Sequence, residues 1–322
     1  MKPITKKLLI ISTCFAGAGI LFTGAGFLAG GRPGFQITKD GLRSASSGEE
    51  AYILEKTELD YFTNIDLNIR SEADIELLPS GDGKFYLEYT LDGSYDEPAY
   101  DVSDGTLTLT QEDNTINGIY FFGPGSFITE TAPCIRIYIP DSLTLSGLDV
   151  YNDYGDLTVN GISAERALLR LGYGDLDMTD SRFTDAEIEL SDGNLEAAAI
   201  SADTLKLTNE YGDSILEQTA VSDAEITIED GGLTLDAYGL KTLSGVNEYG
   251  DTMLTLHDPY NTYSCDLVTE YGKILLPESA EWKLTTDEYS DEMSYQAEAG
   301  GSKKITFTAE DGDIEVKSDL SQ

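Results

Sequence analysis

Residues 167–176 read ALLRLGYGDL, and residues 186–195, nineteen positions later, read AEIELSDGNL. In both segments apolar residues alternate with polar ones up to a bend that contains a glycine. Alternation with a period of two is typical of a β-strand with one buried face. The bend glycine recurs at the same 19-residue interval, at Gly155, Gly174, Gly193, Gly212, Gly231 and Gly250. The sequence therefore predicts a repeat architecture.

Each repeat is predicted to run as strand, glycine bend, strand and turn. Apolar residues stand seven and five positions before the glycine, as at Ala186 and Ile188, and in several repeats two and four positions after it. One repeat cannot bury its apolar face alone, so each strand must pair with its equivalent in the next repeat. The predicted fold class is all-β, a single-stranded, β-helix-like β-solenoid with 19-residue coils. Longer intervals, which mark insertions, separate two further bend glycines, Gly272 and Gly312.

The strands outside the regular repeat are assigned to the two ends of the solenoid. Residues 51–146 alternate in hydrophobicity without the 19-residue interval and are predicted to be an N-terminal β region that covers the first coil. Residues 147–276 form the repeat solenoid, and residues 277–322 contain an insertion and a C-terminal coil or cap. Capping is expected because an open solenoid end is an unpaired edge that invites aggregation.

An uncharged segment of 24 residues, 8–31, follows Lys2, Lys6 and Lys7 near the start of the chain. This length spans a bilayer as a helix, and the preceding lysines predict a cytoplasmic N-terminus at residues 1–7. We expect a single-pass anchor in a bacterial cell membrane, a flexible stalk at residues 32–50, and the bulk of the chain outside the cytoplasm. The alternative is a cleaved signal peptide, because small residues surround Ala25 and Ala29.

The formal net charge of −39 is the most unusual feature of the composition. Such a surface repels nucleic acid and attracts cations, basic peptides or divalent metals. Nucleic-acid binding is therefore excluded. Beyond Cys14 in the apolar segment, only Cys134 and Cys265 remain, and we expect them to be buried free thiols.

Two columns of side chains are predicted beside the bend. Because the coils stack, the residues directly before the glycine should form a column that binds a glycan or an extended peptide, or that only shields the bend. These residues are Tyr154, Tyr173, Tyr211, Tyr249 and Tyr271. Carboxylates directly after the glycine form a second column with weak cation affinity, including calcium, although no metal site or cofactor is assigned. These residues are Asp156, Asp175, Asp213 and Asp251.

Three asparagines, Asn152, Asn209 and Asn247, stand three positions before a bend glycine, and we expect them to form short side-chain hydrogen-bond ladders, a structural role. Catalytic residues are harder to find, because His257 is the only histidine and falls in an inserted turn. Serine and cysteine nucleophiles need a base, so one histidine leaves little room for such a site. We predict that the protein is not an enzyme. A polysaccharide-active β-helix enzyme and a calcium-bridged structural adhesin remain the alternatives.

Five motifs occur in a characteristic order: Ile65-Asp66-Leu67, Ala73-Asp74-Ile75-Glu76-Leu77, Ser80-Gly81-Asp82-Gly83, Asp104 to Leu109, and Ile135 to Pro140. With the glycine repeats that follow, they resemble the bacterial β-strand repeat family labelled "putative adhesin", a domain family of unknown function. The resemblance implies a β-solenoid at a bacterial envelope, with a role in adhesion or envelope-stress signalling and no catalytic residues. Ser191-Asp192-Gly193 matches the bend of that family, whereas Glu210-Tyr211-Gly212-Asp213 departs from it.

Together these features predict a non-catalytic surface scaffold, sensor or binding module. Its expected partners are the membrane through the N-terminal helix and cationic peptides or a membrane protein.

Overall fold

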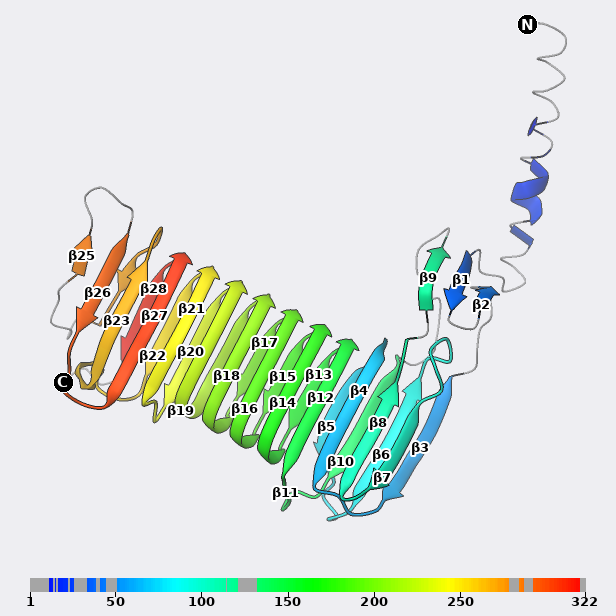
Figure 1. Cartoon of the computed structure of the whole chain (residues 1–322), viewed down its shortest axis with the longest axis horizontal. Coiled ribbons are helices and arrows are strands. Elements are labelled where there is room, and N and C mark those ends of the chain that lie inside the picture. The colour runs from blue at the N-terminus through cyan, green and yellow to red at the C-terminus, as the bar shows by residue number, and fades with distance from the viewer. Residues whose placement is uncertain are drawn as a thin grey trace, which may run out of the picture. The chain divides into compact units, whose positions relative to one another are not determined.

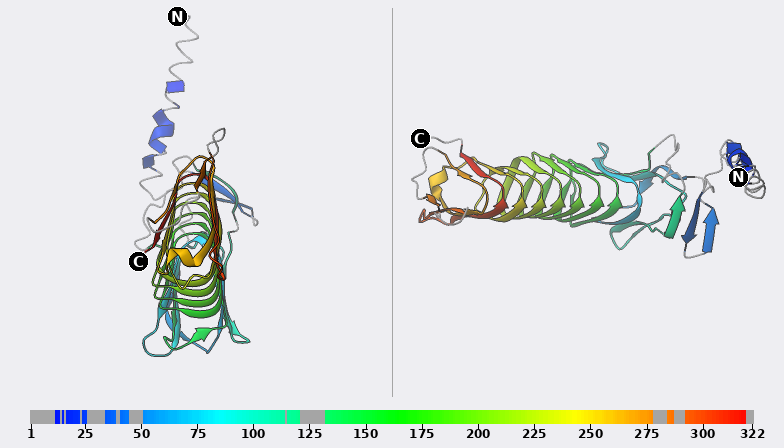
Figure 2. Two further views of the ribbon diagram at one scale, coloured as in Figure 1. Left: turned by 90° about the vertical axis from the view of Figure 1, so that its left-hand side faces the viewer. Right: turned by 90° about the horizontal axis from the view of Figure 1, so that it is seen from above.

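The computed structural model describes residues 12–13, 15, 17–22, 24–25, 34–38, 41–44, 51–113, 115–120, 132–277, 284–286 and 292–318. The chain divides into two compact units. One contains residues 1–51, 92–96 and 113–131, and the other contains residues 52–91, 97–112 and 132–322. The second unit is a stack of β-coils whose strands lie side by side along one axis (Figure 1), and its coils superimpose when viewed end-on (Figure 2). The predicted all-β class is confirmed.

Each coil contributes one strand to either side of the stack. On the first side, neighbouring strands follow this order: β7 (Ala99–Ser103), β8 (Thr106–Gln111), β4 (Asn64–Glu72), β12 (Gly147–Tyr154), β14 (Ser163–Tyr173), β16 (Arg182–Asp192), β18 (Ser201–Tyr211), β19 (Ser214–Asp230), β21 (Thr242–Tyr249), β27 (Lys303–Asp311), β23 (Tyr263–Thr269), β26 (Met293–Ala297) and β25 (Leu284–Thr286). From β8 to β23 all pairings on this side are parallel.

The second side is built in the same way. Its order is β3 (Tyr52–Leu59), β6 (Phe85–Leu91), β10 (Cys134–Ile139), β5 (Asp74–Pro79), β13 (Leu157–Asn160), β15 (Leu176–Thr179), β17 (Leu195–Ala198), the start of β19, β20 (Leu233–Tyr238), β22 (Thr252–Leu256), β28 (Ile314–Ser318) and β24 (Ile274–Leu275). Two short elements, β11 (Thr144–Leu145) and the 3-10 helix η1 (Tyr260–Thr262), lie in the connections.

The core lies between the two sides and is made of equivalent side chains from successive coils. Val150, Leu169, Ile188 and Leu207 are fully buried at one such position, and Leu157, Leu176 and Leu195 at another. Polar residues alternate with them and face outward along each strand. The apolar alternation of the sequence thus defines the inner face of each coil.

The bend glycines bring one backbone directly against the next. A Cβ atom at Gly193 would overlap the carbonyl of Gly174, and a Cβ at Gly174 would overlap that of Gly155. Gly174 also has a φ of +148°, a conformation that other residues adopt only with strain. The backbone N–H of each of the six regularly spaced glycines, from Gly155 to Gly250, donates to the next coil, as from Gly193 to the Tyr211 carbonyl at 2.9 Å. The predicted structural role of these glycines has a direct steric cause.

The order of the coils in space differs from their order in the chain at the C-terminal end. The coil within residues 277–322 was expected to come last, but its strand β27 lies between β21 and β23. Gly312 therefore stacks on Gly250, and Gly272 stacks on Gly312. Side-chain volume accounts for this placement, because Gly245 stands where other coils carry valine, leucine or isoleucine. The buried ring of Phe307 occupies the space that a Cβ at Gly245 would need.

The N-terminal end also differs from the arrangement that the sequence predicted. Residues 51–146 were expected to cover the first coil, yet β4 and β5 themselves form a coil that pairs in parallel with β12 and β13. The pair β8 and β10 lies one coil further out. Beyond them β7, β6 and β3 are antiparallel, as are β26 and β25 at the other end. This region thus supplies both coils and a cap.

The other unit contains a three-stranded antiparallel sheet in the order β2 (Gly41–Ser44), β1 (Gly34–Thr38) and β9 (Thr115–Tyr120). The flexible stalk expected at residues 32–50 is therefore corrected: residues 34–38 and 41–44 are paired strands. Their pairing partner lies about 80 residues further along the chain, so local sequence does not reveal it.

Only part of the predicted membrane anchor, residues 8–31, lies among the described residues, and residues 1–7 lie outside them. The described positions 12–13, 15, 17–22 and 24–25 are helical. Phe15, Ile20, Leu21 and Phe22 expose 74–79% of their surface. Among the described residues, no helix has the length and apolar character that a membrane crossing requires. The anchor stays a prediction.

Replacing Gly193 with alanine tests the glycine contact. The new methyl group would overlap the Gly174 carbonyl, so we expect Gly193→Ala to lower the free energy of unfolding by about 3 kcal/mol or more, at the upper end of overpacking costs. Gly232→Ala is the matched control, because its Cβ would come no closer than 3.3 Å to the Asp213 side chain. Urea denaturation measures both variants. Equal stability losses would contradict the steric argument.

Candidate ligand-binding surfaces

The five tyrosines predicted to form a column lie at the same register position of their coils, but they are not continuous. Tyr154 and Tyr173 are on adjacent coils and stack with ring centroids 5.3 Å apart and planes 6° apart. Beyond them, aspartates alternate with the tyrosines: Asp192 follows Tyr173, and Asp230 lies between Tyr211 and Tyr249. Asp311 separates Tyr249 from Tyr271 because the last coil is inserted between theirs. The bend edge is therefore a mixed Tyr/Asp row.

The predicted acidic column has a structural function. Oδ1 of Asp156 accepts a hydrogen bond from the backbone N–H of Asp175 at 2.9 Å, and Oδ1 of Asp175 accepts one from Asn194 at 2.7 Å. Asp213 and Asp251 accept in the same way from the next coils. This ladder satisfies backbone donors that the bend would otherwise leave unpaired. Cation binding by these carboxylates stays a prediction.

The three asparagines bind backbone carbonyls inside the bend. Asn209 is fully buried, and its Nδ2 donates to the carbonyls of Gly193 at 3.2 Å and Gly212 at 3.0 Å. Asn247 repeats these contacts with Gly231 and Gly250. Asn152 does so with Ala73 and Gly155. Each side chain thus bridges two coils, so the role is structural as expected. The expected ladders between asparagines do not form, because leucine or isoleucine occupies this position on the coils between them.

Between residues 185 and 251, part of the exposed surface repeats every two coils rather than every coil. Residues 185–188 read DAEI, and residues 223–226, two coils later, read DAEI again. Likewise residues 209–213 and 247–251 both read NEYGD. Adjacent coils share the buried pattern but differ at their exposed positions. The 19-residue glycine interval conceals this 38-residue period, which sequence reasoning missed.

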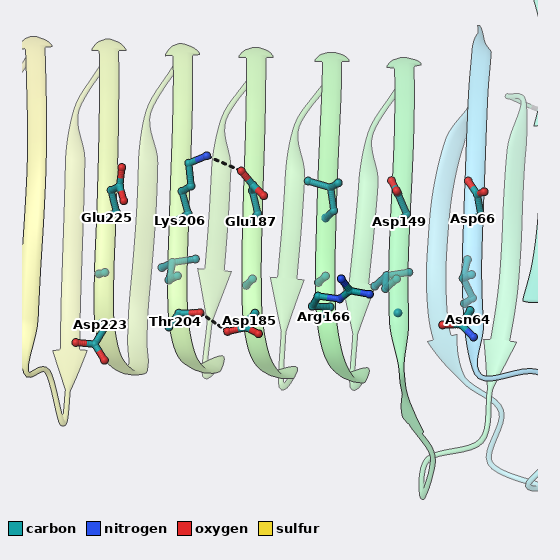
Figure 3. Close-up of a pocket in the computed structure, with 18 of the residues that line it drawn as sticks. Asn64, Asp66, Asp149, Arg166, Asp185, Glu187, Thr204, Lys206, Asp223 and Glu225 are labelled. Atoms are coloured by element: carbon teal, nitrogen blue, oxygen red, sulfur yellow. Dashed lines mark hydrogen bonds and ion pairs between the residues drawn. The ribbon is translucent and has the colours of Figure 1, made fainter.

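A groove crosses the first side of the stack, at a distance from the bend, and encloses about 790 Å³. Its floor contains the buried Ala167, Ala186 and Ala224. Charged side chains stand in two parallel rows across the neighbouring strands (Figure 3). They are Asp66, Asp149, Arg166, Asp185, Glu187, Lys206, Asp223 and Glu225.

From β12 onward, strands that carry acids alternate in this groove with strands that carry none, whereas Asp66 and Asp149 lie on adjacent strands. Asp185 and Glu187 stand on β16, and Asp223 and Glu225 stand on β19, with Lys206 on β18 between them. Lys206 Nζ contacts Glu187 at 2.5 Å, and the Thr204 hydroxyl donates to Asp185 at 2.5 Å. Both partners of the ion pair are roughly half exposed, so the pair contributes little stability. The groove is acidic overall, with acids outnumbering bases.

No catalytic arrangement is evident among the described residues. His257 Nε2 lies 2.5 Å from Asp236, and its ring stacks on Tyr238 with centroids 3.7 Å apart. Nor do the described His, Cys, Asp and Glu side chains form a group that could hold a metal ion. Cys134 and Cys265 are free thiols, as expected. Cys265 is buried, whereas Cys134 is only half-buried.

Taken together, these features define the class of the protein as a capped, mainly parallel β-solenoid whose exposed side chains recur at equivalent positions of its coils. The chain belongs to the Toastrack DUF4097 family, which matches residues 62–317. This confirms the resemblance to β-strand repeat proteins. No curated protein matches the sequence.

Several solved structures are similar to this chain. One is described as a putative adhesin from Bacteroides fragilis NCTC 9343, with a TM-score of 0.43 and 15% identity over 83% of this chain and 97% of that one. Another is a putative adhesin from Parabacteroides distasonis ATCC 8503, with a TM-score of 0.45 and 12% identity over 84% and 98%. A third, from the same organism, is described as a putative lipid binding protein, with a TM-score of 0.37 and 13% identity over 83% and 94%.

The carboxylate ladder can be tested at Asp175, which accepts from both the backbone N–H and the side-chain amide of Asn194. We expect Asp175→Ala to lower the free energy of unfolding by about 1–2 kcal/mol, because a backbone donor loses its partner. Asp175→Asn keeps an acceptor and should cost less than half as much. Urea denaturation of both variants gives the comparison. A similar loss in the two variants would show that the ladder does not stabilise the bend.

The thiols are expected to be unreactive in the folded protein. Burial, with a smaller contribution from Glu76, raises the pKa of Cys134 to about 12, and burial also raises the pKa of Cys265. Because the thiolate is the nucleophile, iodoacetamide at pH 8 should leave both unmodified in a Cys14→Ser background. The urea-unfolded chain should react at both, as mass spectrometry would show. Rapid labelling of the folded protein would contradict this reasoning.

Proposed function

We propose that this protein is a non-catalytic binding module of the bacterial envelope that takes an extended cationic peptide in the acidic groove. The observation that carries the proposal is the acidic lining that recurs on every second strand of the groove from β12 to β19. Asp149, the pair Asp185 and Glu187, and the pair Asp223 and Glu225 are each two coils apart. The strong negative charge of the chain favours the same class of ligand.

The spacing of these acids fits a chain that lies along the solenoid axis. Parallel strands are about 4.8 Å apart, so acids two coils apart are separated by about 9.6 Å. A polyproline II helix rises about 3.1 Å per residue and turns once in three residues, or about 9.3 Å. A peptide in this conformation with a basic residue at every third position would therefore place each cation against successive acids.

The floor and the intervening residues support the same ligand. The floor has small side chains, with Ala167 and Ala186 on adjacent coils and Ala224 two coils further on, and these leave room for the small side chains between the basic ones. Lys206 contacts Glu187 in the free protein, and an exposed pair of this kind is worth at most about 1 kcal/mol. A ligand cation can displace it at little cost.

The location in the envelope rests on the N-terminal segment. Its uncharged run of 24 residues follows three lysines, and four large apolar side chains in its described helical part are exposed. Anchoring by this segment would display the acidic solenoid outside the cytoplasm. Signalling through a membrane protein partner and adhesion are both compatible with such a display.

A pair of peptides with the same composition tests the groove. We expect the full-length chain, in a neutral detergent, to bind (Lys-Pro-Pro)₃ more tightly than Lys-Lys-Lys followed by six prolines, since only the former matches the spacing. Raising the salt concentration should weaken binding of both. Isothermal titration calorimetry at two salt concentrations measures the affinities. Absence of binding at low salt would overturn the proposal.

Substitutions in the groove and outside it test where the peptide binds. We expect Asp223→Asn combined with Glu225→Gln to weaken the spaced peptide about tenfold, because two carboxylates of the groove are lost. Glu196→Gln is the control, because this exposed glutamate lies on β17 on the other side of the solenoid. If the control weakened binding as much as the groove variant, the peptide would bind by overall charge alone.

A further inference from the structure

The bend edge contains a second set of sites, made where an aspartate lies between two tyrosines on neighbouring coils. In the strand register Tyr173 is followed by Asp192 and then Tyr211. Tyr211 is in turn followed by Asp230 and then Tyr249. All three tyrosines expose 50–53% of their surface. The alternation therefore creates two consecutive Tyr-Asp-Tyr slots open to solvent.

The stacked pair Tyr154 and Tyr173 indicates how rings at this position are oriented. Their planes are 6° apart on adjacent coils, so the faces of both rings point along the stack. The bend repeats the same backbone geometry at Tyr211 and Tyr249, where the glycines that follow have φ values of +132° and +146°. We expect these rings to present their faces along the stack as well.

The distance between the walls of a slot suits one planar group. Rings two coils apart are separated by about 9.6 Å, so a group midway lies about 4.8 Å from each ring. This is within the reach of about 6 Å for a cation over an aromatic face. A hollow of about 380 Å³ surrounds Tyr211, with Asp192 on one side and Asp230 on the other.

The aspartates supply the charge at the base of each slot. Asp192 and Asp230 are exposed. Among the described residues, their carboxylates have no hydrogen-bond or ion-pair partner, in contrast to the ladder carboxylates of Asp175 and Asp213. Each therefore retains both oxygens for a ligand.

We propose that the Tyr-Asp-Tyr slots bind guanidinium groups, so that the bend edge reads arginine side chains of a cationic partner. A guanidinium is planar, stacks on aromatic faces, and donates two parallel hydrogen bonds to a carboxylate. It can therefore lie between two tyrosine rings while it pairs with the aspartate. A lysine ammonium is compact and strongly hydrated, and it offers no flat face for stacking. The slots thus select arginine over lysine, which simple charge attraction does not.

This inference goes beyond the proposed function because the slots are separate from the groove. Asp192 lies five residues beyond Glu187 on β16, and Asp230 lies five residues beyond Glu225 on β19. Five residues of strand span about 17 Å. Loss of one site therefore need not affect the other.

Hexa-arginine and hexa-lysine carry the same charge, so a difference between their affinities reports on the slots rather than on charge attraction by the groove. We expect the full-length chain in a neutral detergent to bind hexa-arginine about tenfold more tightly, measured by isothermal titration calorimetry. Tyr211→Leu removes a wall from both slots and should reduce this preference to less than twofold while hexa-lysine affinity stays unchanged. Tyr211→Phe keeps the ring and should keep the preference. Asp230→Asn should lower hexa-arginine affinity more than hexa-lysine affinity.

Each possible result of these titrations supports or overturns the slot proposal. Equal affinity of the wild-type chain for the two peptides overturns the slot proposal but leaves the groove intact. A preference that survives Tyr211→Leu overturns it as well, provided that the circular dichroism melting temperature shows the variant to be folded. If neither peptide binds, both the slots and the proposed function are wrong.

Discussion

The contact of one bend glycine with the carbonyl of the glycine before it is the constraint on which the rest of the solenoid depends. A Cβ atom at Gly174, Gly193 or Gly212 would overlap that carbonyl. With no side chain at this point, the coils approach to the normal spacing of paired strands and both sides of the stack keep their register. The buried leucines and isoleucines then superimpose coil upon coil. The aspartate ladder and the buried asparagines reinforce the same bend.

This constraint leaves the outward positions free to vary, and between residues 185 and 251 several of them vary with a period of two coils. At the bend edge tyrosine alternates with aspartate, and in the groove acidic pairs alternate with threonine and lysine. Had every coil carried the same side chain, the tyrosines would stack on one another as Tyr154 and Tyr173 do. The alternation instead opens spaces of about two strand spacings along the surface.

Much of the fold could be predicted from the sequence, because the glycine interval and the buried alternation are local patterns. The position of β27 could not be predicted from that interval, since it depends on the fit of Phe307 against Gly245 between distant segments. The tyrosines were correctly placed at one register position, but a continuous column ignored Asp192 and Asp230 between them. The groove escaped notice because its acids become neighbours only when coils stack. The repeated DAEI at residues 185–188 and 223–226 was the available signal.

The inserted last coil has a mechanical consequence for the C-terminal end of the solenoid. β27 and β28 are hydrogen-bonded to a neighbour on each side, β21 and β22 on one and β23 and β24 on the other. A terminal coil with one neighbour can peel away strand by strand under load. Here a pull on the C-terminus must break the ladders on both sides of this coil, so the end of the chain is held as firmly as an internal coil.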